Sequence, residues 1–294
     1  MRAVWSLWSK PLLAASGMNW GSARHHLLSW ALSFETARRH YPRTSLVTDD
    51  AGAELLVDRL GLPFDHVATD LNRLSGRDPR LWCLGKLHAY ALQTEPFVHI
   101  DADVYLWRRL PAEVESAPVF AQNPEPFRLG YSDYRPESLE AAIRSAGGWL
   151  PDEFNVPGLL GSELKGACCG IAGGQDADFL RYYAAQACQL VEHPDNAHAW
   201  RQLGDLTAFV TTVEQFLLEA CVSFHAGRAD SGFRGVRIAY LFASAADAYQ
   251  RAESAGYTHL IGGAKSNPAV LDMLDQRVQA DFPAYHERCA RLAD

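Results

Sequence analysis

The sequence lacks any apolar run long enough to cross a membrane. A spanning helix needs about 18 or more consecutive apolar residues, and every apolar stretch in these 294 residues is interrupted sooner. The opening MRAVWSLW is followed by Ser9, Lys10 and Pro11, which break the apolar region that a signal peptide requires. We therefore expect a first β-strand over residues 2–8 and no transmembrane segment.

The sequence also lacks an excess of positive charge. It has 27 Lys and Arg against 35 Asp and Glu, a formal net charge of −8, and the basic residues are scattered. Binding to nucleic acid relies on basic stripes that neutralise phosphates, so a nucleic-acid partner is not expected. An anionic substrate would need local cations or a bound metal.

The six cysteines form no C-x-x-C pair, and the adjacent Cys168 and Cys169 have poor geometry for a disulfide. We expect reduced, mostly buried thiols in a cytoplasmic protein. No internal repeat, low-complexity tract or convincing linker is present. The chain is therefore expected to form a single domain over residues 1–294, with a core that needs no disulfides.

What the sequence does contain is an alternation of strand and helix patterns. The expected strands are followed by amphipathic segments, and Ser22 is a candidate N-cap. Such alternation predicts an α/β fold with a mostly parallel central sheet flanked by helices and a helical C-terminal region. Strands are expected at 2–8, 43–50, 64–67, 96–101, 165–174 and 236–240, and helices at 23–40, 51–62, 81–93, 137–146, 176–192, 205–224 and 244–254.

The stretch PFVHIDADVYLW, residues 96–107, places two aspartates inside an apolar run. If Phe97–Ile100 is a strand, Asp101 and Asp103 follow its carboxyl end, where open α/β sheets bind ligands. On extended backbone, side chains at i and i+2 point the same way, so both carboxylates could share one Mg²⁺ or Mn²⁺ ion. The alternative is that Asp101 or Asp103 only caps the following turn.

A second segment, YTHLIGGAKSNP, contains H-x-x-G-x-x-K in a glycine-rich loop. His259 could supply a third metal ligand, and Lys265 a charge for a phosphate. Around Gly262 the backbone N–H groups can approach an anion closely. In isolation, His259 could equally be an ordinary core or surface histidine.

Taken together, these segments resemble the GT-A nucleotide-sugar glycosyltransferases, and more closely the retaining, glycogenin-like group with D-x-D and H-x-x-G-x-x-K. LWCLGKLHAY, PFVHIDADVYLW, GIAGGQDADFL and the Glu214-Gln215 pair also resemble a bacterial GT-A-like family of unassigned substrate. The resemblance spans nearly the whole chain. It implies a Rossmann-like GT-A domain in which 1–122 bind the nucleotide-sugar and 123–294 form the acceptor side, with a closing C-terminal loop and helices.

Carried over residue by residue, the resemblance implies Asp101, Asp103 and His259 as metal ligands and Lys265 and Gly262 as diphosphate contacts. Lys86, with Trp82 beside it, matches the basic residue that such enzymes direct at the donor, although it could be a solvated helical lysine. The nucleobase and ribose are expected near Trp8, Ser9, Lys10 and Asp49. Asp49 could equally cap the helix that follows it.

The resemblance also implies a sugar and acceptor side. GIAGG, with Gly173 and Gly174, matches a strand and turn that line this side, but Cys168 or Cys169 replaces the usual Asn. Glu214 and Gln215 correspond loosely to an Asp-Gln pair beneath the anomeric carbon, although an exposed helical pair would look the same. The candidate catalytic residues are Gln215, Glu214 and Asp176.

The expected function is a metal-dependent glycosyltransferase of the hexosyltransferase type. It would use Mn²⁺ or Mg²⁺ and transfer a sugar, with retention, from a nucleoside-diphosphate sugar to an acceptor hydroxyl. The donor is expected to be UDP-linked, because the resembling group mostly uses UDP. The acceptor would be a glycan, a lipid-linked group or a protein. One alternative is a nucleotidyltransferase acting on sugar phosphates, but this class has a glycine-rich phosphate loop after the first strand, and SLWSKPLLAASG matches such a loop poorly. The other alternative is a non-catalytic nucleotide-sugar-binding protein.

Overall fold

The computed structural model describes residues 1–14, 20–129, 134–155 and 164–293. The chain divides into two compact units, each built from separate stretches of sequence. Unit 1 comprises Met1–Pro79, Val98–Leu110 and Arg251–Asp294, and unit 2 comprises Arg80–Phe97 and Pro111–Gln250. Both units therefore draw on residues from either side of position 122.

Unit 1 is organised around four strands in the order β4-β1-β2-β3. β1 pairs in parallel with β2, and β2 with β3. β2 is buried along its whole length and β4 likewise, which is the pattern of strands covered on both faces. The bounds are β1 Arg2–Leu7, β2 Thr44–Thr48, β3 His66–Ala68 and β4 Phe97–Ile100.

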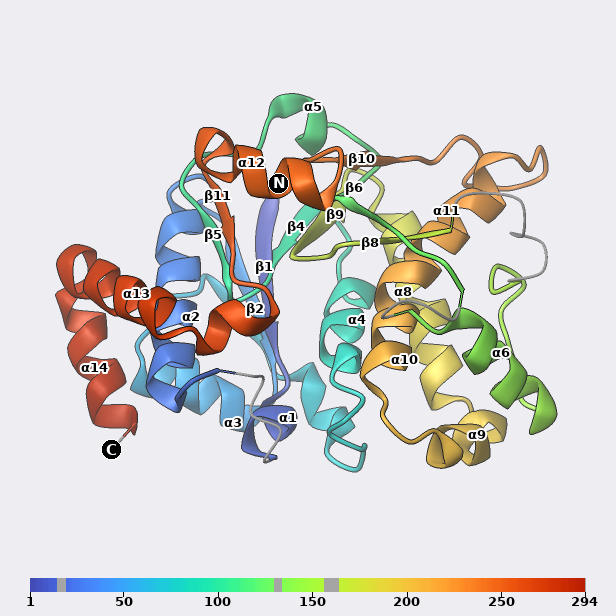
Figure 1. The fold of residues 1–294 in the computed structure, drawn as a ribbon, viewed down its shortest axis with the longest axis horizontal. Helices are drawn as coiled ribbons and strands as arrows, with labels where there is room; N and C mark the ends of the chain where they lie inside the picture. Colours follow the sequence, from blue (N-terminus) through green and yellow to red (C-terminus); the bar gives the residue numbers. More distant parts are fainter. Residues whose placement is uncertain (15–19, 130–133, 156–163, 294) are drawn as a thin grey trace. The chain divides into compact units, whose positions relative to one another are not determined.

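Helix α2, Ala23–Arg38, is the central helix of unit 1. Ser22 caps it, as expected, by accepting a hydrogen bond from the His25 backbone N–H. The C-terminal helices α13 and α14 pack beside α2, as Figure 1 shows in red and blue. The remaining bounds are α1 Ser9–Leu13, α3 Asp50–Ala53, a π-helical turn Glu54–Arg59, a 3₁₀ turn Asp70–Leu74, α13 Pro268–Asp281 and α14 Pro283–Ala293.

A second, two-stranded sheet in unit 1 joins distant parts of the sequence. β5, Val104–Leu106, pairs antiparallel with β11, Tyr257–His259, so that His259 lies opposite Val104. The Trp107 backbone N–H donates to the Gly256 carbonyl at 2.9 Å, and the Trp107 indole N–H donates to Thr258 Oγ1 at 3.0 Å. These bonds fix the register of β11 against β5.

Unit 2 contains a mixed set of short strands. β10 pairs in parallel with β6, β6 pairs antiparallel with β9, and β7 pairs antiparallel with β8. The single strand expected over 165–174 is wrong, because this segment forms β8 and β9 in two different sheets. The bounds are β6 Val119–Ala121, β7 Pro124–Pro126, β8 Lys165–Ala167, β9 Ile171–Gly174 and β10 Ile238–Tyr240.

The expected helices at 81–93, 137–146, 176–192 and 205–224 are present in unit 2, the one at 244–254 forms α12 across the boundary at Gln250, and α5 and α9 were not predicted. The helix predicted over 205–224 is continuous but includes a π-helical segment in its middle. The bounds are α4 Cys83–Ala91, α5 Ala112–Glu115, α6 Pro136–Ser145, α8 Ala177–Glu192, a 3₁₀ turn Pro194–Asn196, α9 Ala197–Gln202, α10 Thr207–Thr211, the π-segment Thr212–Phe216, α11 Leu217–Ala226 and α12 Ala245–Ala255.

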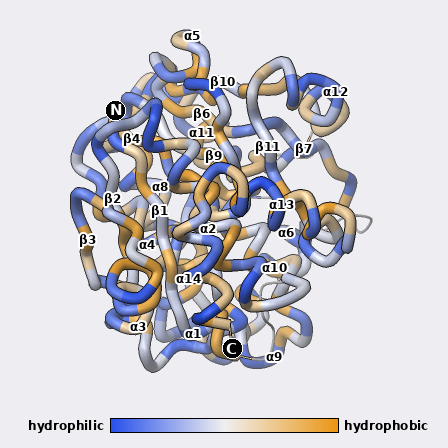
Figure 2. The backbone as a smooth tube through the Cα atoms, turned by 90° about the vertical axis from the view of Figure 1, so that its left-hand side faces the viewer, coloured by the Kyte–Doolittle hydropathy of each residue, from blue (hydrophilic) through white to orange (hydrophobic). Residues whose placement is uncertain are grey.

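The structure is thus an α/β fold with a mixed but mostly parallel central sheet flanked by helices. Figure 2 shows how hydrophobic and hydrophilic segments are distributed along the backbone; α12, a mixed segment, buries none of its side chains. All six cysteines are buried and reduced, as expected. None of the helices in the described part of the chain has the length and hydropathy of a membrane span.

Gly174, at the end of β9, is constrained by a close backbone approach. A Cβ added there would lie 2.0 Å from the Pro118 carbonyl oxygen. Because backbone cannot yield as a flexible side chain can, we expect Gly174→Ala to lower the free energy of unfolding by about 3 kcal/mol. Urea denaturation measures this change. The matched control is Gly204→Ala, where an added Cβ meets nothing within 4 Å, and equal stability of the two variants would contradict the packing explanation.

Candidate metal centre

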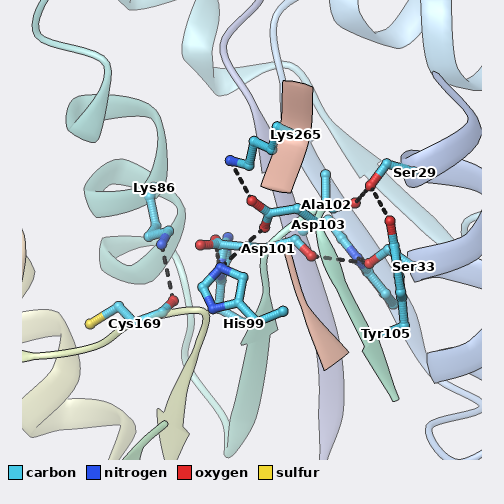
Figure 3. Close-up of polar contacts among 12 residues, drawn as sticks. Ser29, Ser33, Lys86, His99, Asp101, Ala102, Asp103, Tyr105, Cys169 and Lys265 are labelled. Atoms are coloured by element: carbon cyan, nitrogen blue, oxygen red, sulfur yellow. Dashed lines mark hydrogen bonds and ion pairs between the residues drawn. The ribbon is translucent and has the colours of Figure 1, made fainter. Parts of the chain in front are cut away.

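Asp101 and Asp103 lie in a tight turn between β4 and β5. The expectation of extended backbone is wrong here, because the Val104 N–H bonds back to the Asp101 carbonyl at 3.0 Å. Two serines of α2 bind the turn through hydrogen bonds to its backbone carbonyls. Ser29 Oγ donates to the Ala102 carbonyl at 2.7 Å and Ser33 Oγ to the Asp101 carbonyl at 3.1 Å, as Figure 3 shows.

The pairing of β5 with β11 brings His259 to the same turn. His259 Nε2 lies 3.5 Å from Asp103 Oδ1, and the Leu260 N–H donates to the Asp103 carbonyl at 3.0 Å. One ligand atom from each of Asp101, Asp103 and His259 lies within 4.8 Å of the others. The structure therefore brings together three residues that the sequence keeps far apart.

Lys265 completes this cluster. Its ammonium group lies 2.5 Å from Asp103 Oδ2 and faces the Trp20 ring at 5.9 Å; Figure 3 shows it pointing at the carboxylate. The loop that places it turns at Gly262, whose φ of 53° is in the left-handed region that glycine favours. Lys265 thus contacts a predicted metal ligand rather than open solvent.

The electrostatics of the cluster keep Asp103 ionised. Burial alone would raise the pKa of Asp103, but the charges of His259 and Lys265 and their hydrogen bonds outweigh burial and lower this pKa well below its usual range. Its side chain is 10% exposed, against 26% for Asp101. The cluster therefore has one buried carboxylate and one that faces a more open side.

Asp101 lies beside His99, a residue that was not predicted to be part of the site. His99 Nδ1 lies 3.6 Å from Asp101 Oδ1, and His99 Nε2 bonds to Ser6 Oγ at 2.9 Å. The sequence held a signal for this contact, because His99 and Asp101 are two positions apart at the end of a strand. Ser29 and Ser33, one turn apart in the otherwise apolar stretch 27–34 of α2, were a similar signal.

The residues fit a divalent cation on two grounds. First, among the described residues the two carboxylates face a single ammonium group, so with His259 neutral the cluster keeps negative charge that a cation would neutralise. Second, Lys265 already shows that a positive group is held against Asp103. Carboxylate oxygens with one imidazole suit Mn²⁺ or Mg²⁺, with imidazole favouring the former. Asp101, Asp103 and His259 would hold the ion.

His26, on α2, is affected by the same charges. Burial, and to a smaller degree repulsion from Lys265, lower the pKa of His26 to about 4 from 6.5, although Asp103 opposes this shift. The Trp30 indole N–H donates to His26 Nε2 at 3.1 Å, which requires the unprotonated nitrogen. His26 is therefore a neutral, buried acceptor.

We expect the free energy of unfolding to fall as the pH falls from 6.5 to about 4, because the unfolded chain binds a proton that folded His26 excludes. The loss is on the order of 3 kcal/mol for this pKa difference. His26→Gln, which keeps an acceptor for Trp30, should flatten the slope. Urea denaturation of both proteins across this pH range, with a metal chelator present, measures the pH dependence of the free energy of unfolding. The same dependence in wild type and His26→Gln would show that His26 does not cause it.

Two of the residues predicted to contact the nucleoside, Ser9 and Asp49, are hydrogen-bonded to each other. Ser9 donates to Asp49 Oδ2 through its backbone N–H at 3.0 Å and its hydroxyl at 2.8 Å, while Asp49 Oδ1 accepts from the Gly52 N–H. The capping alternative for Asp49 is therefore confirmed. Lys10 Nζ donates to the Ser75 and Arg77 carbonyls at 2.7 Å each, and Trp8 is buried.

Unit 2 brings Lys86 and Glu214 together. Lys86 Nζ lies 2.8 Å from Glu214 Oε1 and donates to the Cys169 carbonyl at 3.0 Å, the latter drawn in Figure 3. The two side chains are 12% and 1% exposed. Lys86 and Glu214 are thus a buried ion pair, and neither is the solvated helical side chain that was the alternative.

The other predicted residues of unit 2 have ordinary structural partners. Gln215 Oε1 accepts from the Tyr134 hydroxyl at 2.5 Å. Asp176 caps α8 by accepting from the Phe179 N–H. Trp82 is half-buried immediately before α4, and Gly173 pairs with Phe120 in the sheet. Their functional roles stay predictions.

Comparison with protein families places the chain in one of them. A family described as of unknown function, DUF6734, matches residues 1–292. The chain belongs to this family. No curated protein matches it. Membership covers almost the whole chain, so both units and the candidate metal centre lie within the region that defines the family.

Proposed function

We propose that this protein is a metal-dependent glycosyltransferase that transfers a sugar from a nucleoside-diphosphate sugar to an acceptor hydroxyl. The observation that carries the proposal is the convergence of Asp101, Asp103 and His259 within 4.8 Å, from two segments joined by the β5–β11 pair. Mn²⁺ is the preferred ion and a UDP-sugar the preferred donor. GT-A is the preferred form of the fold.

In the proposed reaction, the bond between the anomeric carbon and the diphosphate oxygen breaks, and a bond from that carbon to the acceptor oxygen forms. The acceptor oxygen attacks the face that the diphosphate leaves, so the anomeric configuration is retained, and the departing phosphate oxygen takes the acceptor's proton, so no separate base is required. When bound, a divalent cation would neutralise charge that develops on the leaving diphosphate.

The chain's own residues contribute in three ways. Asp103, kept ionised by its neighbours, is a ready ligand at neutral pH. Lys265 lies against the ligand cluster, so its ammonium group would exchange its ion pair with Asp103 for one with a phosphate oxygen of the bound donor. The Ser29 and Ser33 hydrogen bonds fix the turn that carries both aspartates, so little reorganisation is needed on binding.

The test is product analysis of nucleotide-sugars incubated with the full chain and Mn²⁺. A glycosyltransferase with water as a poor acceptor slowly releases free sugar and nucleoside diphosphate. A nucleotidyltransferase supplied with pyrophosphate would instead form a nucleoside triphosphate and a sugar phosphate. Release of the diphosphate from at least one UDP- or GDP-linked donor, lost on chelation, is the expected result, and the absence of both reactions across the panel would contradict the proposal.

A further inference from the structure

A second cluster of metal-ligating side chains lies in unit 2, on two helices that pack against each other. His88 is on α4, and Cys188 and Glu192 are on α8. The latter two are four positions apart, so they lie on the same face of α8. One ligand atom from each of the three lies within 4.8 Å of the others.

The distances between the ligand atoms of this cluster are close to those around a tetrahedral metal ion. His88 Nε2 lies 3.1 Å from Glu192 Oε2. With metal–ligand bonds of about 2.0 to 2.3 Å, ligand atoms around tetrahedral zinc lie about 3.3 to 3.8 Å apart. The three side chains therefore need shifts of only about 1 Å to share an ion.

The chemistry of the ligands separates this cluster from the first one. A thiolate, an imidazole and a carboxylate form the mixed sulfur, nitrogen and oxygen set that zinc prefers, whereas Mn²⁺ and Mg²⁺ prefer oxygen. His88 and Cys188 are nearly buried, and the Glu192 side chain is 20% exposed. A thiolate and a carboxylate together carry two negative charges, so a Zn²⁺ complex would be neutral, which reduces the cost of burial.

We propose that His88, Cys188 and Glu192 bind Zn²⁺ and so cross-link α4 to α8. On binding, the Cys188 thiol loses its proton to solvent, a zinc–sulfur bond forms, and water takes the fourth position from the side where Glu192 is exposed. The ion would also hold the helix that carries Lys86, whose ammonium group bridges Glu214 and the Cys169 carbonyl. This inference does not depend on the proposed glycosyltransferase function.

The experiment uses the full chain with a tag that contains no histidine, stripped of metal with chelator and titrated with Co²⁺. We expect one equivalent to produce a thiolate-to-cobalt charge-transfer band that Zn²⁺ abolishes by displacement. Cys188→Ala should remove the band, and Glu192→Gln should weaken Co²⁺ binding by about tenfold or more. Asp103→Asn should keep the band, because Asp103 belongs to unit 1.

The control is Cys83→Ala, which removes a different buried thiol, on α4, that is outside the ligand group, and it should leave the band in place. Circular dichroism verifies that each variant is folded, and Glu192→Gln provides a second test if Cys188→Ala does not fold. The proposal is overturned if the wild-type chain gives no band, if folded Cys188→Ala retains it, or if Glu192→Gln binds Co²⁺ with unchanged affinity.

Discussion

Replacing Asp103 by asparagine is expected to reduce sugar transfer by about a thousandfold and to weaken Mn²⁺ binding by about a hundredfold or more. The substitution keeps the shape of the side chain but removes the buried carboxylate that faces both His259 and Lys265. Loss of one charged ligand removes several kcal/mol of stabilisation from the charge that develops on the diphosphate, which corresponds to a rate effect of this size.

Steady-state kinetics with the best donor of the panel, at saturating Mn²⁺, measures the change. The matched control is Asp58→Asn, which removes an exposed carboxylate from the same unit and should leave the rate unchanged. Full activity in folded Asp103→Asn would show that the cluster is only a structural ion pair.

The second large effect concerns the buried pair of Lys86 and Glu214. Lys86→Met is expected to lower the free energy of unfolding by about 3 to 5 kcal/mol, because it leaves the Glu214 carboxylate buried without its cation. Glu214 Oε2 already has no hydrogen-bond partner among the described residues. The double variant Lys86→Met with Glu214→Gln should lose less than the sum of the two single changes.

Urea denaturation of the single and double variants measures this coupling. Arg181→Met is the matched control, since its pair with Asp178 has the same 2.8 Å separation but is exposed, and it should cost less than about 1 kcal/mol. Strict additivity of Lys86→Met and Glu214→Gln would mean that the two side chains do not interact energetically. A stable Lys86→Met variant that is nevertheless inactive would favour a direct role of Lys86 at the donor.

Much of unit 1 could be predicted because its local signals agree with its tertiary structure. Ser22 at the start of α2 and the apolar run before Asp101 are each found at a predicted boundary, and Gly61, near the end of the range 51–62 expected to be helical, has a φ of 79°. Gly61 ends the helical segment because only a residue without Cβ adopts this conformation at little cost.

The errors arose where tertiary contacts decide the conformation. KGACCGIAGG appears as one strand in sequence, but β8 pairs with β7 and β9 pairs with β6, and this divides the segment. The turn at Asp101 to Asp103 likewise depends on the serines of α2, which lie far away in sequence. Local propensity does not contain such information.

The candidate site shows the same contrast. Asp101, Asp103, His259 and Lys265 could be named from their motifs, and the structure places them in one cluster. The pairing of Lys86 with Glu214 could not be predicted, because it depends on how α4 packs near the π-segment that carries Glu214. Nor did six scattered cysteines indicate that Cys188 would lie beside His88.

The central claim is that one Mn²⁺ ion at Asp101, Asp103 and His259 recruits a nucleoside diphosphate. Isothermal titration calorimetry of UDP and GDP into the metal-stripped full chain, with and without Mn²⁺, tests it most directly. We predict that Mn²⁺ tightens binding of at least one of these nucleotides by about tenfold or more, and that Asp103→Asn removes this dependence. Nucleotide binding that is absent in both conditions, or equally tight in both, would contradict the account.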